Sequence, residues 1–266
     1  MFFYFGRRVA DRHRRVACAT PIDSGMDYLI LVSSIVLGAL TVIGFKLHEP
    51  RHVKLLNSFT GAFLLSLTLL HLLPELYTFP PGEGGKKALL VLGALMLAGF
   101  FVQLALDYIS MGVEHGHSHH LHGHAPYGVV AGLCMHALVE GMGLGNVQTY
   151  YDPESRRLLL WSIVVHNYPV SIALLGMLLA WGMKRGNALA LLGLFAAMGP
   201  LGMILSGHIP LLAHHSRELM AIVIGIFMHI STTILFESGE AHRIHVPKLV
   251  AIIIGTALGV SAVLLD

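Results

Sequence analysis

The sequence predicts an all-α integral membrane protein whose eight transmembrane helices pack as one bundle. The first observation is composition: 55% of the residues are hydrophobic and only 12% are charged, whereas a soluble domain carries about 25% charged residues. The second is a series of apolar runs, each about 20 residues long, which is the length a helix needs to cross the hydrocarbon core of a bilayer. This composition excludes a cytosolic enzyme, a nucleic-acid-binding protein and a disordered regulator.

Polar or turn-rich segments separate the apolar runs and set the limits of the expected helices. The predicted membrane helices cover residues 28–45, 56–79, 88–111, 128–147, 158–183, 188–207, 219–236 and 247–265. Trp161 and Trp181 lie about 30 Å apart along a helix, the spacing of aromatic anchors at the two membrane interfaces.

Residues 1–25 differ from the rest of the chain because they contain five arginines and no adequate apolar segment after them. A cleaved secretory signal is therefore not expected. We interpret residues 1–25 as a leader or disordered N-terminal tail and residues 26–266 as the transmembrane domain; an ordinary cytosolic basic tail is the alternative. Loop lysines and arginines favour an outside N-terminus only slightly, and the arginines of the leader would reverse that balance. Charge alone does not settle the orientation.

Several ionisable side chains fall inside the predicted spans, where each costs several kcal/mol unless it is paired or faces a polar path. His71 precedes Glu75, and His136 precedes Glu140, by four residues, which places both members of each pair on one helix face. Imidazole nitrogen and carboxylate oxygen are ligands for zinc and other first-row divalent ions. The alternative is a His–Glu hydrogen bond that closes a helix–helix contact.

The depth of these residues supports a shared metal site. If the helices alternate from an outside N-terminus, four side chains lie roughly 10–16 Å below the outer surface: His71, His136, Glu140 and His166. One common level is what a single buried site requires. Pro169, three residues after His166, removes a backbone hydrogen bond, and the resulting kink suits a site that opens and closes.

A histidine-rich loop over residues 113–127 joins the third and fourth predicted helices. Its histidines are His115, His117, His119, His120, His122 and His124. With interspersed glycines, this composition is typical of a flexible, low-affinity metal-binding tract.

Four residues outside the loop are additional candidates for metal binding or for the ion pathway: Glu75, Asn167, His229 and Glu237. Of these, His229 is followed by Ser231, Thr232 and Thr233, which could line a polar path.

These motifs occur in a familiar order. The histidine-rich loop, the His-Leu-Leu-Pro-Glu segment ending at Glu75, the His136-to-Gly141 segment and the His-Asn-Tyr-Pro segment starting at His166 resemble the ZIP (Zrt/Irt-like) family of divalent-metal transporters. The segment from Gly225 to Glu237 looks like that of bacterial members. The resemblance covers the chain from about Met26 to its end.

That resemblance implies a non-enzyme that takes up zinc into the cytosol, with iron, manganese or cadmium as alternative ions. It implies an integral membrane protein of the bacterial inner (plasma) membrane with both termini outside. Position by position, His71, His136, Glu140 and His166 match the first metal site of the family. Many members hold a second ion, but Ala137 and Val170 stand at two of its ligand positions, so we do not expect a complete second site. The expected partners are divalent metal ions and the lipid bilayer, with no nucleic acid and with a homodimer left open.

Two rival functions would use the same residues. A membrane-embedded zinc-dependent hydrolase would bind zinc on the histidines and use the carboxylate as a base. A metal-efflux protein would be compatible with the histidine-rich loop. A hydrolase should keep its zinc through washing, whereas a carrier exchanges it, and efflux should lower cellular metal.

Overall fold

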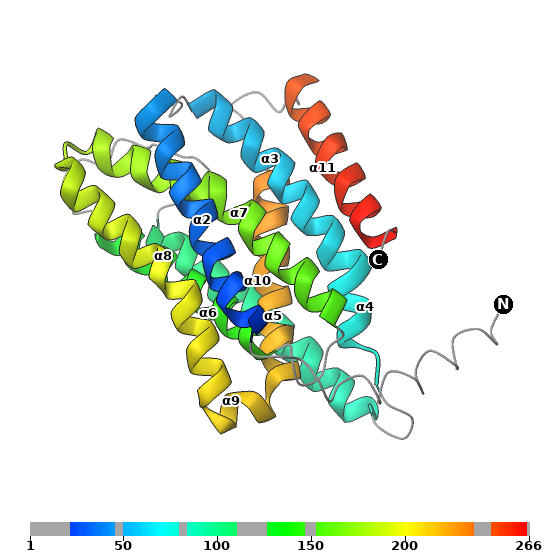
Figure 1. Cartoon of the computed structure of the whole chain (residues 1–266). Helices are drawn as coiled ribbons and strands as arrows, with labels where there is room; N and C mark the ends of the chain where they lie inside the picture. Colours follow the sequence, from blue (N-terminus) through cyan, green and yellow to red (C-terminus); the bar gives the residue numbers. More distant parts are fainter. Residues whose placement is uncertain are drawn as a thin grey trace.

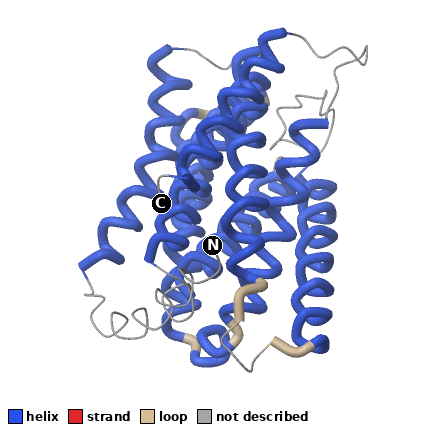
Figure 2. The backbone as a smooth tube through the Cα atoms, turned by 90° about the vertical axis from the view of Figure 1, so that its right-hand side faces the viewer, coloured by secondary structure: helices blue, strands red, loops and turns tan. Residues whose placement is uncertain are grey.

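The computed structural model describes residues 22–45, 50–79, 84–110, 127–146, 153–236 and 246–264. Within these ranges every regular element is a helix, as the tube in Figure 2 shows. Eight helices in the described part of the chain are long and apolar enough to cross a membrane. The predicted all-α membrane fold is therefore confirmed. Residues 1–21, the histidines of the 113–127 loop and Glu237 lie outside the described residues.

The long helices have bounds close to those expected. They are α2 (Ile22–Phe45), α3 (Pro50–Leu67), α5 (Lys86–Ser110), α6 (Tyr127–Asn146), α7 (Pro153–Ala180), α8 (Arg185–His208), α10 (Ser216–Phe236) and α11 (Val246–Leu264). A π-helix, η2 (Thr68–Leu72), and the short α4 (Leu73–Leu76) continue α3, and the short α9 (Pro210–His214) precedes α10. Helix α2 starts at Ile22, so residues 22–25, which we interpreted as the end of the N-terminal tail, are helical.

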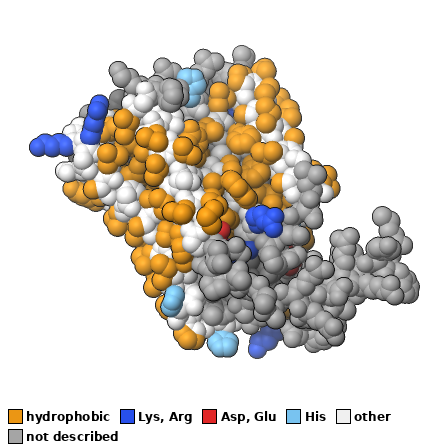
Figure 3. All heavy atoms as spheres, in the orientation of Figure 1, with side chains coloured by type: hydrophobic (Ala, Val, Ile, Leu, Met, Phe, Trp, Pro, Cys, Tyr) orange, Lys and Arg blue, Asp and Glu red, His pale blue; other side chains and the backbone are white. Residues whose placement is uncertain are grey.

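Large apolar side chains cover the outside of the molecule. Figure 3 shows one face on which hydrophobic side chains predominate over much of the described surface. On α5, for example, Leu90, Leu97 and Phe101 are exposed. A contiguous apolar surface of this extent is suited to lipid chains rather than water.

The helices pack most extensively in four pairs: α2 with α7, α6 with α8, α3 with α11, and α5 with α10. The first two pairs contact each other through α8, which packs on both α2 and α7, and we call these four helices group A. The last two pairs are joined by the contact between α3 and α10, and we call these four helices group B. The groups meet where α5 packs on α6 and α3 packs on α7. The neighbouring positions of α3 and α11 are visible in Figure 1.

Glycines allow the backbones to approach at these crossings. A Cβ at Gly225 of α10 would overlap the carbonyl of Met96 on α5, and a Cβ at Gly141 of α6 would overlap that of Gly199 on α8. Small residues at helix crossings allow close van der Waals contact in a membrane, where there is no hydrophobic driving force between helices. The close α6–α8 approach at Gly141 fixes the helix that carries Glu140.

Candidate metal centre

Helix α6 presents a histidine and a glutamate on the face that is turned into the bundle. His136 and Glu140 are both 0% exposed, and His136 Nε2 lies 3.0 Å from Glu140 Oε1. The four-residue spacing stacks the two side chains one turn apart, as the sequence predicts. Two potential ligands therefore reach one point from a single helix.

Helix α7 adds a third potential ligand at this point. The buried His166 ring lies 5.7 Å from the His136 ring, centroid to centroid, at an interplanar angle of 80°. One ligand atom from each of His136, Glu140 and His166 lies within 4.8 Å of the others. Pro169 lies inside the helix, three residues after His166, where its missing N–H leaves the carbonyl of Val165 without its helical partner. Three side chains from two helices thus converge at one buried point.

The donor set of this centre fits a divalent cation. Two imidazoles and one carboxylate are ligands that zinc accepts, commonly with a fourth position filled by water or substrate. Glu140 Oε2 is buried and has no hydrogen-bond partner among the described residues. A buried carboxylate oxygen without a partner is costly, so a bound cation would offset that cost.

His71, the expected fourth ligand, is not a member of this cluster. It lies on η2 and is half-buried, and the Leu73 N–H bonds to the Thr68 carbonyl across the widened turn. Pro74, directly after that turn, lacks an N–H for the regular helical bond. The prediction of one regular α-helix through His71 and Glu75 did not include this π-helix, which places His71 in a widened turn. Glu75 is half-buried on α4 and also lies outside the cluster.

Gln103 of α5 is a contact of the site that sequence reasoning missed. Its side chain is 0% exposed, and its Oε1 lies 2.9 Å from His136 Nδ1. The signal in the sequence is a polar amide inside a highly apolar span, one turn before Asp107. Buried amides are expected to have hydrogen-bond partners, but the sequence does not identify which residue that partner is.

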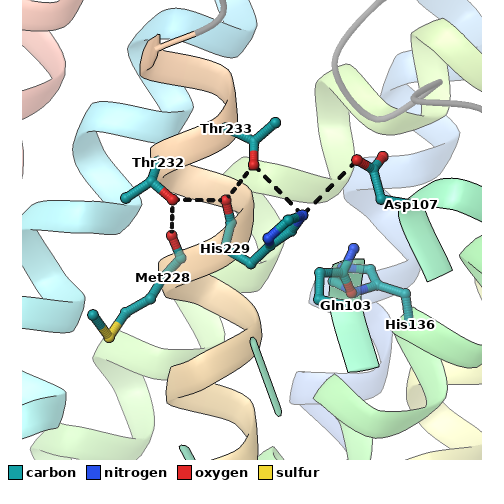
Figure 4. Close-up of polar contacts among 7 residues, drawn as sticks. All are labelled: Gln103, Asp107, His136, Met228, His229, Thr232 and Thr233. Carbon is teal, nitrogen blue, oxygen red and sulfur yellow. Dashed lines mark hydrogen bonds and ion pairs between the residues drawn. The ribbon is translucent and has the colours of Figure 1, made fainter. Parts of the chain in front are cut away.

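A second polar group lies on α10 and α5, as Figure 4 shows. His229 Nε2 lies 3.8 Å from Asp107 Oδ2 and 3.5 Å from Thr233 Oγ1, and Phe100 packs its ring edge-to-face with the His229 ring at 4.9 Å. Asp107 of α5 thus pairs with a side chain of another helix. Gln103 and Asp107 lie one turn apart on α5, so one helix contacts both His136 and His229.

The positions that would complete a second ion site are apolar or amide. Ala137 and Val170 are buried in the hydrophobic core. Asn167, beside His166, is buried, and its Oδ1 has no hydrogen-bond partner among the described residues. One amide oxygen is a weak basis for a second ion, and the single site stays a prediction.

Comparison with known proteins connects this geometry to a family. The family model described as ZIP Zinc transporter matches residues 115–264. The chain belongs to the ZIP zinc transporter family. No curated protein matches the chain. The matched region includes all three clustered ligands on α6 and α7, as well as His229 on α10.

Membership establishes the class of activity. ZIP proteins transport metal ions across membranes, so a divalent metal is the transported substrate and the chain is an integral membrane transporter. ZIP proteins are not enzymes, and the alternative of a membrane-embedded hydrolase is therefore wrong.

Proposed function

We propose that this ZIP protein takes up zinc into the cytosol by way of the site between α6 and α7. The observation that supports this proposal is the buried convergence of His136, Glu140 and His166. An intramembrane ionisable cluster is a candidate ion pathway by default, and this cluster has the nitrogen and oxygen donors that zinc accepts.

A three-residue site suits a transported ion better than a permanently held one. Structural zinc sites are closed by four protein ligands, whereas three ligands leave a position open for exchange. Transport requires binding that is strong enough to admit the ion and weak enough to release it. His71 remains a predicted fourth ligand, contributed by η2, with Glu75 as an additional candidate near it. The same donors accept iron, manganese and cadmium, so zinc is proposed as the main substrate among several.

We further propose that the polar group on α5 and α10 is part of the ion's path. Asp107 and His229 contact each other inside a span, and Thr233 adds a hydroxyl beside them. Polar groups at this depth are costly unless they serve a polar path or pair with one another. Asn167 and Glu237 are further candidates for this path.

We propose that the protein lies in the bacterial plasma membrane with both termini outside. A homodimer stays a prediction.

Metal accumulation in cells tests the direction and the substrate. Cells that express the protein should gain radiolabelled zinc faster than cells that express Glu140→Ala, because only the former have an intact site. Competition with unlabelled iron, manganese or cadmium then ranks the substrates. A fall in cellular zinc on expression would instead indicate efflux and would contradict the proposed uptake.

Deletion of residues 115–124 should leave zinc uptake measurable. The six histidines of this loop are proposed to bind metal with low affinity, and they are separate in sequence from the α6–α7 ligands. We expect a changed dependence of uptake on zinc concentration, or a changed shut-off at high zinc, measured as initial rates at several concentrations. Complete loss of uptake by a well-expressed deletion variant would show that the loop belongs to the permeation path.

A further inference from the structure

The contact between Gln103 and His136 has a direct chemical consequence for metal binding. A carboxamide oxygen can only accept a hydrogen bond. With Gln103 Oε1 at 2.9 Å from His136 Nδ1, the hydrogen of a neutral His136 lies on Nδ1. The lone pair then lies on Nε2, the nitrogen that faces Glu140 at 3.0 Å.

We propose that Gln103 is a positioning residue for transport, because it holds His136 in the tautomer and ring orientation that direct Nε2 at the metal. This inference rests on the proposed role of His136 as a ligand. Metal-binding histidines generally donate their second ring N–H to a fixed acceptor, and loss of that acceptor typically costs 10–100-fold in metal affinity. In this chain the acceptor is an amide supplied by a different helix.

The contact between Gln103 and His136 also links the two helix groups. His136, Glu140 and His166 all belong to group A, whereas Gln103 comes from α5 of group B. The same face of α5 carries Phe100 and Asp107, which contact His229 of α10. Figure 4 shows Gln103 beside His136 and Asp107 facing His229. The orientation of one ligand therefore depends on how the two helix groups are docked.

Variants of Gln103 separate the acceptor role from simple packing. Gln103→Met keeps similar length and volume but lacks the acceptor oxygen, whereas Gln103→Glu keeps an acceptor in a side chain of the same length. Zinc affinity is measured on the purified full-length protein by competition with a chromophoric chelator. The His136→Ala variant, which keeps the histidine-rich loop, defines the zinc bound elsewhere on the chain.

We expect Gln103→Met to weaken zinc binding at the helix site by about 10–100-fold and Gln103→Glu to stay close to wild type. Wild-type affinity in Gln103→Met would overturn the proposal. Equal losses in both variants would also overturn it, because they would indicate packing rather than an acceptor. If His136→Ala binds zinc as the wild type does, the proposed transport site itself fails, and this outcome is distinct from a failure of Gln103 alone.

A second measurement does not depend on whether any Gln103 variant folds. Nitrogen-15 NMR of labelled histidines in the zinc-loaded wild type distinguishes metal-bound from protonated ring nitrogens, and the His136 signals are those missing from His136→Ala. We expect Nε2 bound to zinc and Nδ1 protonated. Coordination through Nδ1 with a proton on Nε2 would contradict the role assigned to Gln103.

Discussion

Replacement of Glu140 by Ala is expected to reduce zinc uptake by at least about 100-fold. Loss of a residue that only hydrogen-bonds to a metal ligand typically costs about 10–100-fold, and loss of a ligand itself should cost at least as much. Glu140 supplies the only carboxylate among the three clustered ligands. Without it, two neutral imidazoles would face a divalent ion in a buried, low-dielectric site, where charge compensation matters most. Initial uptake of radiolabelled zinc, normalised to the protein in the membrane, measures the effect.

Matched controls distinguish ligand loss from damage to the fold. Glu140→Gln preserves the side-chain size and should also lose most uptake, since it removes the charge. Glu218→Ala removes a carboxylate that lies partly exposed near His215 and should transport normally. His71→Ala should have a smaller effect than Glu140→Ala, because His71 lies outside the cluster. Wild-type uptake by a correctly folded Glu140→Ala protein would rule out the proposed site.

Replacement of Arg156 by Ala is expected to destabilise the protein by about 3 kcal/mol, the cost of breaking a buried ion pair at one partner. Arg156 of α7 forms an ion pair with Asp27 of α2, and the two side chains are only 13% and 10% exposed. The loss would leave Asp27 with an unpaired charge in a poorly solvated environment. Thermal unfolding of the purified protein in detergent, followed as loss of monodisperse protein, measures the shift.

Arg157 offers the matched control for this pair. It is the next residue along α7 and is exposed, so Arg157→Ala should change stability by less than about 0.5 kcal/mol. The double variant Asp27→Asn with Arg156→Gln should recover part of the loss, because no unpaired charge remains. If Arg156→Ala and Arg157→Ala unfold at the same temperature, the ion pair makes no measurable contribution.

The helical architecture could be predicted because it depends on local properties of the chain. Apolar runs of membrane-spanning length, bounded by turn-forming segments, determine where helices begin and end whatever their neighbours are. The pairing of His136 with Glu140 was also predictable, because a four-residue spacing fixes the relative position of two side chains within one helix.

Contacts between helices required the tertiary structure. The sequence marks Gln103, Asp27 and Arg156 as polar groups in or beside spans, but partners on different helices depend on how those helices dock. The prediction for His71 assumed a regular α-helix, yet His71 lies in a π-helix and outside the ligand cluster. A local pattern assumes a regular helix and cannot detect such a turn.

The sequence alone therefore determined the membrane class, the eight spans and the ZIP resemblance. It also identified the three residues that converge between α6 and α7, which are His136, Glu140 and His166. Only the tertiary structure decided that Gln103 contacts His136, that Asp107 faces His229, and that His71 lies outside the cluster. The physical reason is that periodicity and spacing specify the face of a single helix. The close glycine-mediated crossings between helices then decide which faces meet.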